Sequence, residues 1–326
     1  MIVVRITSGL GNQMFQYSFY RLMQETYKDT KVKADLTWFY SNNDHHGYEL
    51  ERVFGNVPGS RFHIDEASKA ELFRVTGLIP ALNKSPGFER FRRYPNRILR
   101  EITGPGRKPY VIDELFGDIK NEDRISEDGS VRNDMYEKLM NLDVSKDWYI
   151  MGYFIEEKYY MPHLEMMRDE LYFDKGRLDG ENSRILKEIE DSVSVSIHVR
   201  RGDYLSEQYA DKFVSLKPDY YKKAIEIIEE RVEKPHYFIF SDDPEFAAKA
   251  FDHLDNKSIV SCNRGEDSYK DMQLMSCCRH NIIANSTFSE WAALLNRNRN
   301  RLVIYPGAYM RDKDKEEKSM EGFIRI

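Results

Sequence analysis

The sequence predicts an α/β protein of two Rossmann-like domains, residues 1–155 and residues 156–326. In residues 193–305, short apolar runs alternate with amphipathic stretches, which is typical of a parallel sheet with helices on both faces. The N-terminal part repeats the order of strand, turn and helix less regularly. A chain of 326 residues is long enough for two domains of ordinary size.

Composition narrows the class of protein. With 41% apolar and 32% charged residues, the balance is that of a soluble globular chain. The net charge of -6 argues against a nucleic-acid partner. The three cysteines are an odd number, and two of them are neighbours, which favours a reducing compartment. No apolar run approaches the roughly 18 residues that span a membrane, and no apolar signal region opens the chain.

The first element is a strand at Ile2–Ile6, and a glycine-rich turn follows it within Thr7–Tyr17. The turn runs into a helix that should continue to about Lys28. This order aims backbone N–H groups and a helix N-terminus at an anion. Within the turn, Met14 is expected to pack in the helix, as are Phe15 and Tyr17.

A dinucleotide-binding fingerprint is an alternative for the same turn. Gly9 and Gly11 have its spacing, but Met14 stands where the third glycine belongs. Asp35, at the end of a second strand predicted over residues 31–36, keeps a nicotinamide-dependent enzyme open as an alternative.

Residues 38–56 are rich in aromatic and polar side chains, and they include the run His45-His46-Gly47-Tyr48-Glu49-Leu50. Such a segment can stack on a sugar, and it can equally be an ordinary surface loop.

The stretch Lys84–Lys108 has a positive net charge, whereas the net charge of the whole chain is negative. It holds eight basic and two acidic residues, a local net charge of +6. One interpretation is a solvated helix face. The other is attraction to an anionic membrane surface or to a lipid-linked diphosphate.

The middle of the chain is less regular. Residues 113–147 predict loops and short helices, and Trp148–Phe154 predicts a strand. Residues 156–191 predict helices that break near 174–176 and 179–180, where we expect the chain to cross between domains.

The strand predicted at Val193–Val199 ends in two arginines, a glycine and an acid. The carboxyl ends of strands are where open α/β sheets build ligand sites. Arg200 and Arg201 suit a diphosphate, because a guanidinium fork matches phosphate oxygens. A solvated Arg-Arg-Gly-Asp turn is the alternative.

A second strand, His236–Phe240, delivers Asp242 and Asp243 in the same way after the amphipathic helix of residues 218–231. We assign Asp243 as the N-cap of the next helix, since Pro244 follows it. Asp242 is then the candidate ligand. The remaining predicted elements are strands at 257–262, 281–284 and 301–305, helices at 268–278 and up to Asn296, and a solvated tail at 311–318.

Four stretches resemble the α-1,2-fucosyltransferases of glycosyltransferase family 11. They are His198-Val-Arg-Arg-Gly-Asp-Tyr204, the Gly-Leu-Gly-Asn-Gln-Met-Phe-Gln-Tyr run ending at Tyr17, the Ser-Asp-Asp of residues 241–243, and Asn285-Ser-Thr-Phe-Ser-Glu-Trp291. The resemblance covers residues 1 to about 305. Ile155 departs from the family, in which a glutamine usually follows the Gly-Tyr-aromatic run.

The resemblance implies the two-domain GT-B architecture, with the site in the cleft between the domains. GDP-fucose would be the donor, held by residues 156–326, and a galactose-terminated glycan, lipid-linked in one version, the acceptor. It also implies a set of donor-binding residues: Gly11, Asn12, Gln13, His198, Arg200, Arg201, Asp242, Ser286, Thr287, Phe288 and Ser289. Asp242 would contact the guanine edge or the ribose hydroxyls.

Neither a metal nor a cofactor is expected. The only Asp-x-Asp, Asp312-Lys-Asp314, lies in the charged tail, so Arg200 and Arg201 would neutralise the departing GDP. The α-fucoside product implies inversion and a general base. Asp203, Glu207 and Glu49 are the candidates, and the sequence does not rank them.

Three rivals stay open: another fucosyltransferase linkage, a nicotinamide-dependent enzyme and a catalytically silent sugar-binding module. Because animal members carry an N-terminal membrane anchor, its lack suggests a bacterial-type cytoplasmic enzyme. The stretch Lys84–Lys108 is the candidate for peripheral contact with the inner membrane surface.

Overall fold

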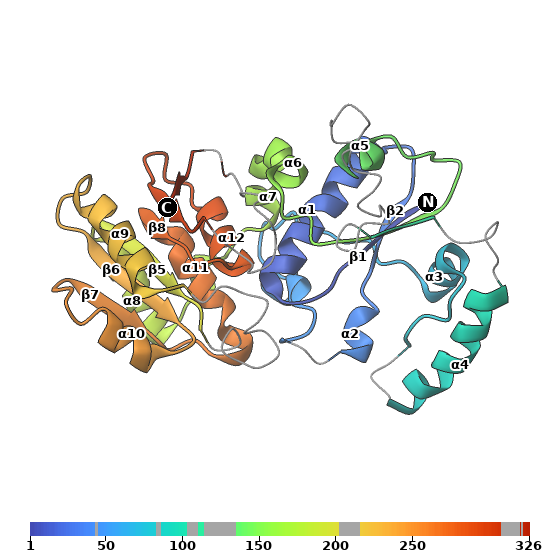
Figure 1. The fold of residues 1–326 in the computed structure, drawn as a ribbon, viewed down its shortest axis with the longest axis horizontal. Helices are drawn as coiled ribbons and strands as arrows, with labels where there is room; N and C mark the ends of the chain where they lie inside the picture. The colour runs from blue at the N-terminus through green and yellow to red at the C-terminus, as the bar shows by residue number, and fades with distance from the viewer. Residues whose placement is uncertain are drawn as a thin grey trace. The chain divides into compact units, whose positions relative to one another are not determined.

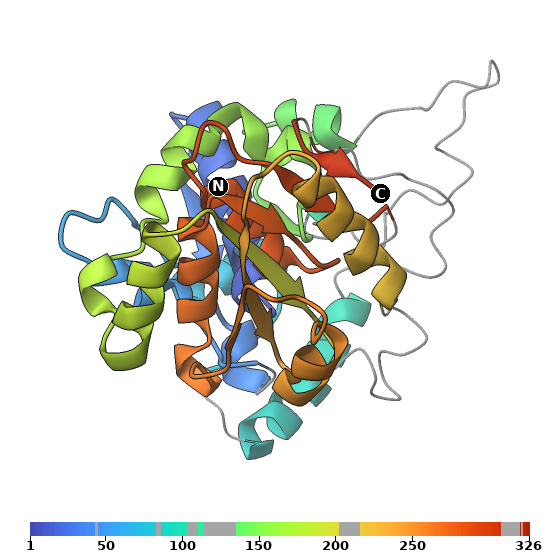
Figure 2. The same cartoon turned by 90° about the vertical axis from the view of Figure 1, so that its left-hand side faces the viewer.

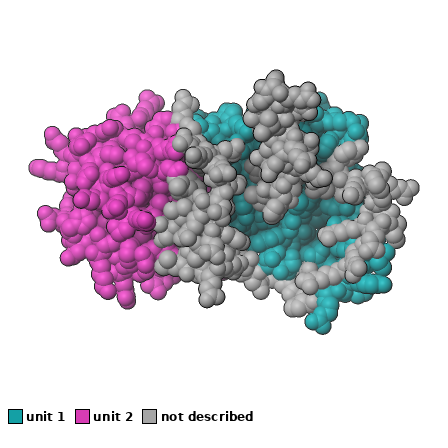
Figure 3. Space-filling view, viewed as in Figure 1, with its two compact units in different colours: residues 1–172 teal, residues 173–326 magenta. Residues whose placement is uncertain are grey.

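The computed structural model describes residues 1–42, 45–82, 86–102, 110–113, 135–201, 216–307, 320 and 322–326. Internal contacts divide the chain into two compact units, unit 1 (Met1–Tyr172) and unit 2 (Phe173–Ile326) (Figure 3). The sequence placed the division after Ile155. The difference arises because α6 (Glu157–Tyr160) packs on α1 (Leu10–Thr26), with the rings of Phe15 and Tyr160 5.1 Å apart.

Unit 1 is built on a four-stranded parallel sheet of order β2-β1-β4-β3. Helix α1 lies alongside β1 and β2 of this sheet (Figure 1). Its strands are β1 (Ile2–Arg5), β2 (Val32–Asp35), β3 (Tyr110–Asp113) and β4 (Trp148–Met151). Its other helices are α2 (Trp38–Ser41), the π-helical turn η1 (Glu51–Gly55), α3 (Lys69–Thr76), α4 (Pro86–Ile102), α5 (Met135–Met140), η3 (Met161–His163) and α7 (Leu164–Glu170). β1 lies between β2 and β4, so the first strand of the chain is central to the sheet.

Helix α1 is buried along nearly its whole length. Met14, Phe15 and Tyr17 are fully buried, which confirms that they pack in the core. The ring of Phe19 stacks on Phe154 with centroids 3.7 Å apart. This aromatic packing joins α1 to the chain that follows β4, and it keeps residues 156–172 in unit 1.

Unit 2 is built on a six-stranded parallel sheet of order β10-β9-β8-β5-β6-β7. Its strands are β5 (Ser194–Val199), β6 (His236–Ser241), β7 (Lys257–Val260), β8 (His280–Ile282), β9 (Val303–Tyr305) and β10 (Ile324–Arg325). The last strand predicted from the sequence is 301–305, so β10 was not predicted. Two residues are too few for a periodic pattern, and only the pairing of Ile324 with Ile304 makes them a strand.

The core of unit 2 follows the alternation in β5. Val195, Ile197 and Val199 are buried in one apolar cluster with residues of α9 (Pro218–Glu229) and α10 (Pro244–Ala250). The alternate residues lie on the other face, where Ser196 accepts a 2.7 Å hydrogen bond from Asn281. The other helices of the unit are η4 (Lys175–Arg177), α8 (Gly180–Glu190), η6 (Gly265–Asp267), α11 (Tyr269–Cys277) and α12 (Thr287–Leu295). Helices cover both faces of this sheet (Figure 2).

The predicted class of two Rossmann-like, GT-B-like α/β domains is therefore confirmed. None of the helices among the described residues is long and apolar enough to cross a membrane. The charged tail of residues 311–318 lies outside the described residues.

Candidate functional site

The sheet of unit 2 has a topological switch point between β5 and β8. From β5 the chain adds β6 and β7 on one side, and it then returns to add β8, β9 and β10 on the other. Open α/β sheets bind ligands in the crevice outside the carboxyl ends of the strands at such a point. Two of the predicted stretches, residues 198–201 and 285–289, follow these two strands.

The carboxyl ends of β5 and β6 are joined by the two arginines and the two aspartates. The backbone N–H of Arg201 donates to Asp242 Oδ1 at 2.9 Å. Arg200 Nε lies 3.5 Å from Asp242 Oδ2. Asp243 is the N-cap of α10 and accepts from the N–H of Phe246 at 3.0 Å, which confirms its predicted capping role. Asp242 therefore orients the arginine turn from the neighbouring strand.

The two arginines differ in their surroundings. The guanidinium of Arg201 lies 3.6 Å from the ring centroid of Phe246, and its Nε lies 3.4 Å from Asp243. Stacking and pairing together hold that side chain against α10. Arg200 forms the ion pair with Asp242 given above, and its side chain is 31% exposed, close to the 28% of Arg201. Both arginine side chains are therefore partly exposed at this edge.

His198 is a buried, neutral imidazole at the same edge. Burial, with a smaller contribution from the charge of Arg200, lowers the pKa of His198 to about 3. Its ring lies 5.8 Å from that of Phe288, across the switch point. Nδ1 is buried and has no hydrogen-bond partner within the described parts of the chain. Such an atom can bond to a ligand without bringing a charge of its own.

The turn after β8 opens α12. Ser286 is its N-cap and accepts from the N–H of Phe288 at 3.3 Å. Ser286, Thr287 and Phe288 are partly exposed at the start of this helix. A helix N-terminus carries partial positive charge and favours an anion. The N–H groups at the start of α12 and the side chain of Arg200 can therefore attract an anion at this edge, and Glu290 is buried in the first turn of the same helix.

Ser289 is a correction. It was predicted to face a diphosphate, but its side chain is fully buried. Its hydroxyl accepts from the N–H of Ala284 at 3.2 Å and lies 3.3 Å from the carbonyl of Ser286. Ser289 stabilises the turn from inside and does not face a ligand.

Asp271 is a candidate that the sequence analysis did not single out. It lies in the first turn of α11, and Asn263, just beyond the carboxyl end of β7, donates to its carboxylate at 2.7 Å. Burial raises the pKa of Asp271 to about 7, although the bond from Asn263 opposes the shift. The partner comes from a separate loop, so spacing alone carried no signal.

Unit 1 has its own switch point, between β1 and β4. Gln16 links the two strand ends: its Nε2 donates to the carbonyl of Gly152 at 2.9 Å, and its Oε1 accepts from the N–H of Thr7 at 2.8 Å. Ser8, with φ of 70°, and Phe154, with φ of 52°, have left-handed backbones here. Non-glycine residues in that region are strained and are enriched at functional sites.

The three residues predicted in the glycine turn have different environments. Gly11 is buried at the start of α1, and Asn12 is partly exposed and donates to Ser8 Oγ at 3.2 Å. Gln13 is a correction, because it is fully buried and its amide is used internally. Its Nε2 donates to the carbonyls of Ser8 and Gly47 at 2.7 and 2.8 Å.

Two predicted residues cannot be placed. Asp203 and Glu207 lie outside the described residues. Glu49, the third candidate base, is 2% exposed and paired with Arg52 at 2.7 Å. Among the described residues, no cluster of three or more histidine, cysteine, aspartate or glutamate side chains is arranged to hold a metal ion.

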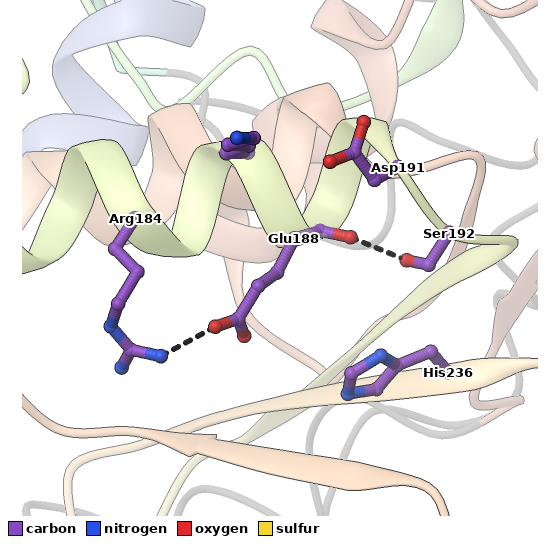
Figure 4. Close-up of a pocket in the computed structure, with 6 residues that line it drawn as sticks. Arg184, Glu188, Asp191, Ser192 and His236 are labelled. Carbon is purple, nitrogen blue, oxygen red and sulfur yellow. Dashed lines mark hydrogen bonds and ion pairs between the residues drawn. The ribbon is translucent and has the colours of Figure 1, made fainter.

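A surface pocket lies at the opposite, amino end of the unit 2 sheet (Figure 4). Ser192 precedes β5 and His236 begins β6, while Arg184 and Glu188 pair with each other on α8. None of the predicted site residues lines this pocket. Its opposed charges satisfy one another, and we assign it no function.

Comparison with known proteins gives a match to the model of glycosyl transferase family 11 over residues 1–323. An O-antigen biosynthesis glycosyltransferase, WbnK, of Escherichia coli is 29% identical over 98% of this chain and 99% of its own length. An alpha-1,2-colitosyltransferase of Escherichia coli is 28% identical over 94% of this chain and 91% of its own length. The mouse galactoside 2-alpha-L-fucosyltransferase Sec1 is 30% identical over 32% of this chain and 29% of its own length.

Proposed function

The chain belongs to glycosyltransferase family 11, and on that premise we propose that it transfers L-fucose from GDP-fucose to the 2-hydroxyl of a terminal galactose in a glycan. The observation that carries the donor half of this proposal is the set of anion-binding groups at the carboxyl edge of the unit 2 sheet. Arg200, the neutral His198 and the N-terminus of α12 all lie at the carboxyl edge of one switch point. These groups suit a nucleoside diphosphate.

The same groups support catalysis without a metal. When the bond between fucose and GDP breaks, negative charge develops on the leaving diphosphate. A preoriented guanidinium and helix N–H groups stabilise such charge. Asp242, which pairs with Arg200, keeps the guanidinium oriented before the reaction. We therefore expect full activity in EDTA, and strong inhibition by EDTA would overturn the metal-free mechanism.

Transfer from a β-linked donor to an α-fucoside inverts the anomeric carbon. The acceptor hydroxyl must then attack from the face opposite GDP, and a base must receive its proton. Asp203 and Glu207 remain the proposed bases. Glu49 is a poorer candidate, since its carboxylate is buried and paired with Arg52.

Colitose transfer is the second candidate function, and the relative named as a colitosyltransferase favours it. Colitose differs from fucose by the loss of the 3-hydroxyl. A site that hydrogen-bonds that hydroxyl rejects the deoxy sugar strongly, by about 10⁴-fold or more, whereas an apolar site discriminates weakly. The ratio of kcat/KM for the two GDP-sugars therefore separates the two functions.

The test offers GDP-fucose and GDP-colitose, in EDTA, with a panel of β-galactosides, and determines the product linkage by NMR. An α-1,2-fucosyl galactoside supports the proposal. A strong preference for GDP-colitose moves the chain to the second candidate. GDP release without a glycoside product would retain the donor and reject galactose as the acceptor. An absorbance spectrum typical of bound nicotinamide would identify the nicotinamide-dependent enzyme. Binding of GDP without turnover would identify the catalytically silent sugar-binding module.

We also propose an anionic membrane surface as a partner, through α4. Phe91 and Tyr94 on this helix are 68% and 72% exposed. On its inner side, Asn96 is buried and bonds to both backbone groups of Ile79, at 2.7 and 3.0 Å. Exposed aromatic rings on a helix whose surrounding stretch has a net charge of +6 are typical of helices that lie on anionic lipid.

Sedimentation with vesicles tests this partner. The double substitution Phe91→Ser and Tyr94→Ser should abolish binding to phosphatidylglycerol vesicles, and Tyr172→Ser, an exposed aromatic outside α4, should leave it unchanged. Vesicles of phosphatidylcholine alone should bind neither the wild type nor the double variant. Equal sedimentation of the wild type with both lipids, or of the double variant with phosphatidylglycerol, would reject α4 as the docking helix.

A further inference from the structure

Helix α1 begins without a conventional cap. Its N-cap is Gly9, which has no side chain, and its first turn contains no acidic residue. A helix start of this kind leaves N–H donors and partial positive charge open to an anion. From the glycine-rich sequence, that anion was expected to come from the donor.

The structure supplies the anion from within the chain. The carboxylate of Glu49, which lies 39 residues further along the sequence, faces the backbone N–H of Leu10, and this N–H acts to lower the pKa of the carboxyl. The same carboxylate accepts from Arg52 Nη2 at 2.7 Å, and the residue is 2% exposed. The charge at the start of α1 is therefore already compensated.

A second set of contacts fixes the segment that carries Glu49. The amide of Gln13 accepts from the N–H of Glu49 at 2.9 Å and donates to Ser8 and Gly47. A side chain at Gly9 would meet the ring of His45 at 3.3 Å, so the turn and the segment are in close contact. The run of residues 45–50, to which the proposed function gives no role, is thus bound to the glycine turn on several sides.

From these contacts we infer that Glu49 is a positioning residue, the internal counter-ion that holds the glycine turn in its active shape. The shape matters because Ser8, at the centre of the turn, has a strained backbone with φ of 70°. Asn12 bonds to Ser8, and both residues are partly exposed in the turn. Glu49 acts on the sugar substrates through Asn12 and does not touch them.

The inference rests on the proposed function, and it assigns the two units different tasks. Phosphate binding belongs to unit 2, because the helix N-terminus in unit 1 is occupied. A change at Glu49 should therefore lower turnover and leave the affinity for GDP intact. This split between turnover and nucleotide affinity separates a positioning role from a donor-phosphate role.

The inference also predicts a pH effect. Burial raises the pKa of Glu49, against the opposing charges of Arg52 and His46 and the N–H of Leu10. As the pH falls through this raised pKa, the carboxylate becomes neutral and its hold on Leu10 and Arg52 weakens. Turnover should therefore have an acid limb that belongs to Glu49.

The experiment compares Glu49→Gln and Arg52→Met with the exposed neighbour Glu51→Gln as control. Glu49→Gln should lower kcat roughly 10- to 100-fold, the size of one charged hydrogen bond. It should remove the acid limb, speed hydrogen exchange at the amide of Leu10 and leave the Kd for GDP unchanged. Arg52→Met leaves the carboxylate buried without its partner, so it should move the acid limb to higher pH. Glu51→Gln should change none of these.

Unchanged exchange at Leu10 and unchanged kcat in Glu49→Gln would overturn the inference, as would a weakened Kd for GDP. If Glu49→Gln does not fold, the acid limb of Arg52→Met decides alone, and a limb that does not move rejects the role. Failure of the proposed function differs from failure of this inference. If the wild-type protein transfers no fucose, hydrogen exchange at Leu10 and the affinity for GDP can still be compared between the variants.

Discussion

The two units contain sheets of the same kind, each with a switch point beside a helix N-terminus, yet the two points differ in the polar groups that lie at the strand ends. In unit 2 the strand ends supply Arg200 and the neutral His198, and Ser286 caps α12. In unit 1 the corresponding helix start is neutralised by Glu49 of the same chain. Topology predicts where a site can form, but the local charges decide what it can bind.

Similar side chains within unit 2 also differ in their surroundings. Arg200 and Arg201 are neighbours, and only Arg201 is stacked on Phe246. Ser286 and Ser289 belong to the same turn, and only Ser289 is buried. Three predictions test this division of roles, in order of expected effect.

The largest effect is expected at Arg200. Arg200→Ala should lower turnover with GDP-fucose about 10²–10³-fold, the usual loss for one donor that stabilises a developing charge. Steady-state kinetics measures this loss, with the exposed Arg231→Ala as control. A loss of less than tenfold would mean that the carboxyl edge of unit 2 does not stabilise the leaving diphosphate through Arg200, and the contrast with the helix start of unit 1 would be lost.

The next effect concerns His198 and the pH dependence of stability. Its pKa is lowered from 6.5 to about 3 in the folded protein, so below pH 6.5 the unfolded chain binds the proton first. Stability is therefore lost as the pH falls from 6.5 toward 3. His198→Gln should reduce this slope by about 1.4 kcal/mol per pH unit.

Urea unfolding at several pH values between 7 and 4 measures that slope. The exposed His253→Gln is the control and should leave it unchanged. Equal slopes in the wild type and His198→Gln would mean that the imidazole is not the buried neutral group on which the unit 2 site depends.

The smallest effect is expected at Ser289. Ser289→Ala removes the acceptor for the N–H of Ala284 and should lower the free energy of unfolding by about 1 kcal/mol. Its KM for GDP-fucose should stay within about twofold of the wild type, since the hydroxyl faces inward. A KM raised tenfold with unchanged stability would restore Ser289 as a ligand of the donor.

Much of the site region was predictable because its signals are local. The alternation in residues 193–199 predicts a strand, and the structure confirms it, with the apolar residues in one cluster and both faces of the strand buried. Asp243 before a proline indicates a helix cap, which the structure also confirms. Arg200, Arg201 and Asp242 follow predicted strands, and parallel pairing brings such ends to one edge.

The sequence by itself therefore determined most of the strands and helices, the parallel α/β class and the edge at which the polar groups gather. Only the tertiary structure decided what those groups contact. It turned Gln13 and Ser289 inward, set Glu49 against the start of α1 and exposed Phe91 on α4. The physical reason is distance along the chain, since each of these outcomes depends on which remote segments pack together, and a periodic pattern reports only burial within one element.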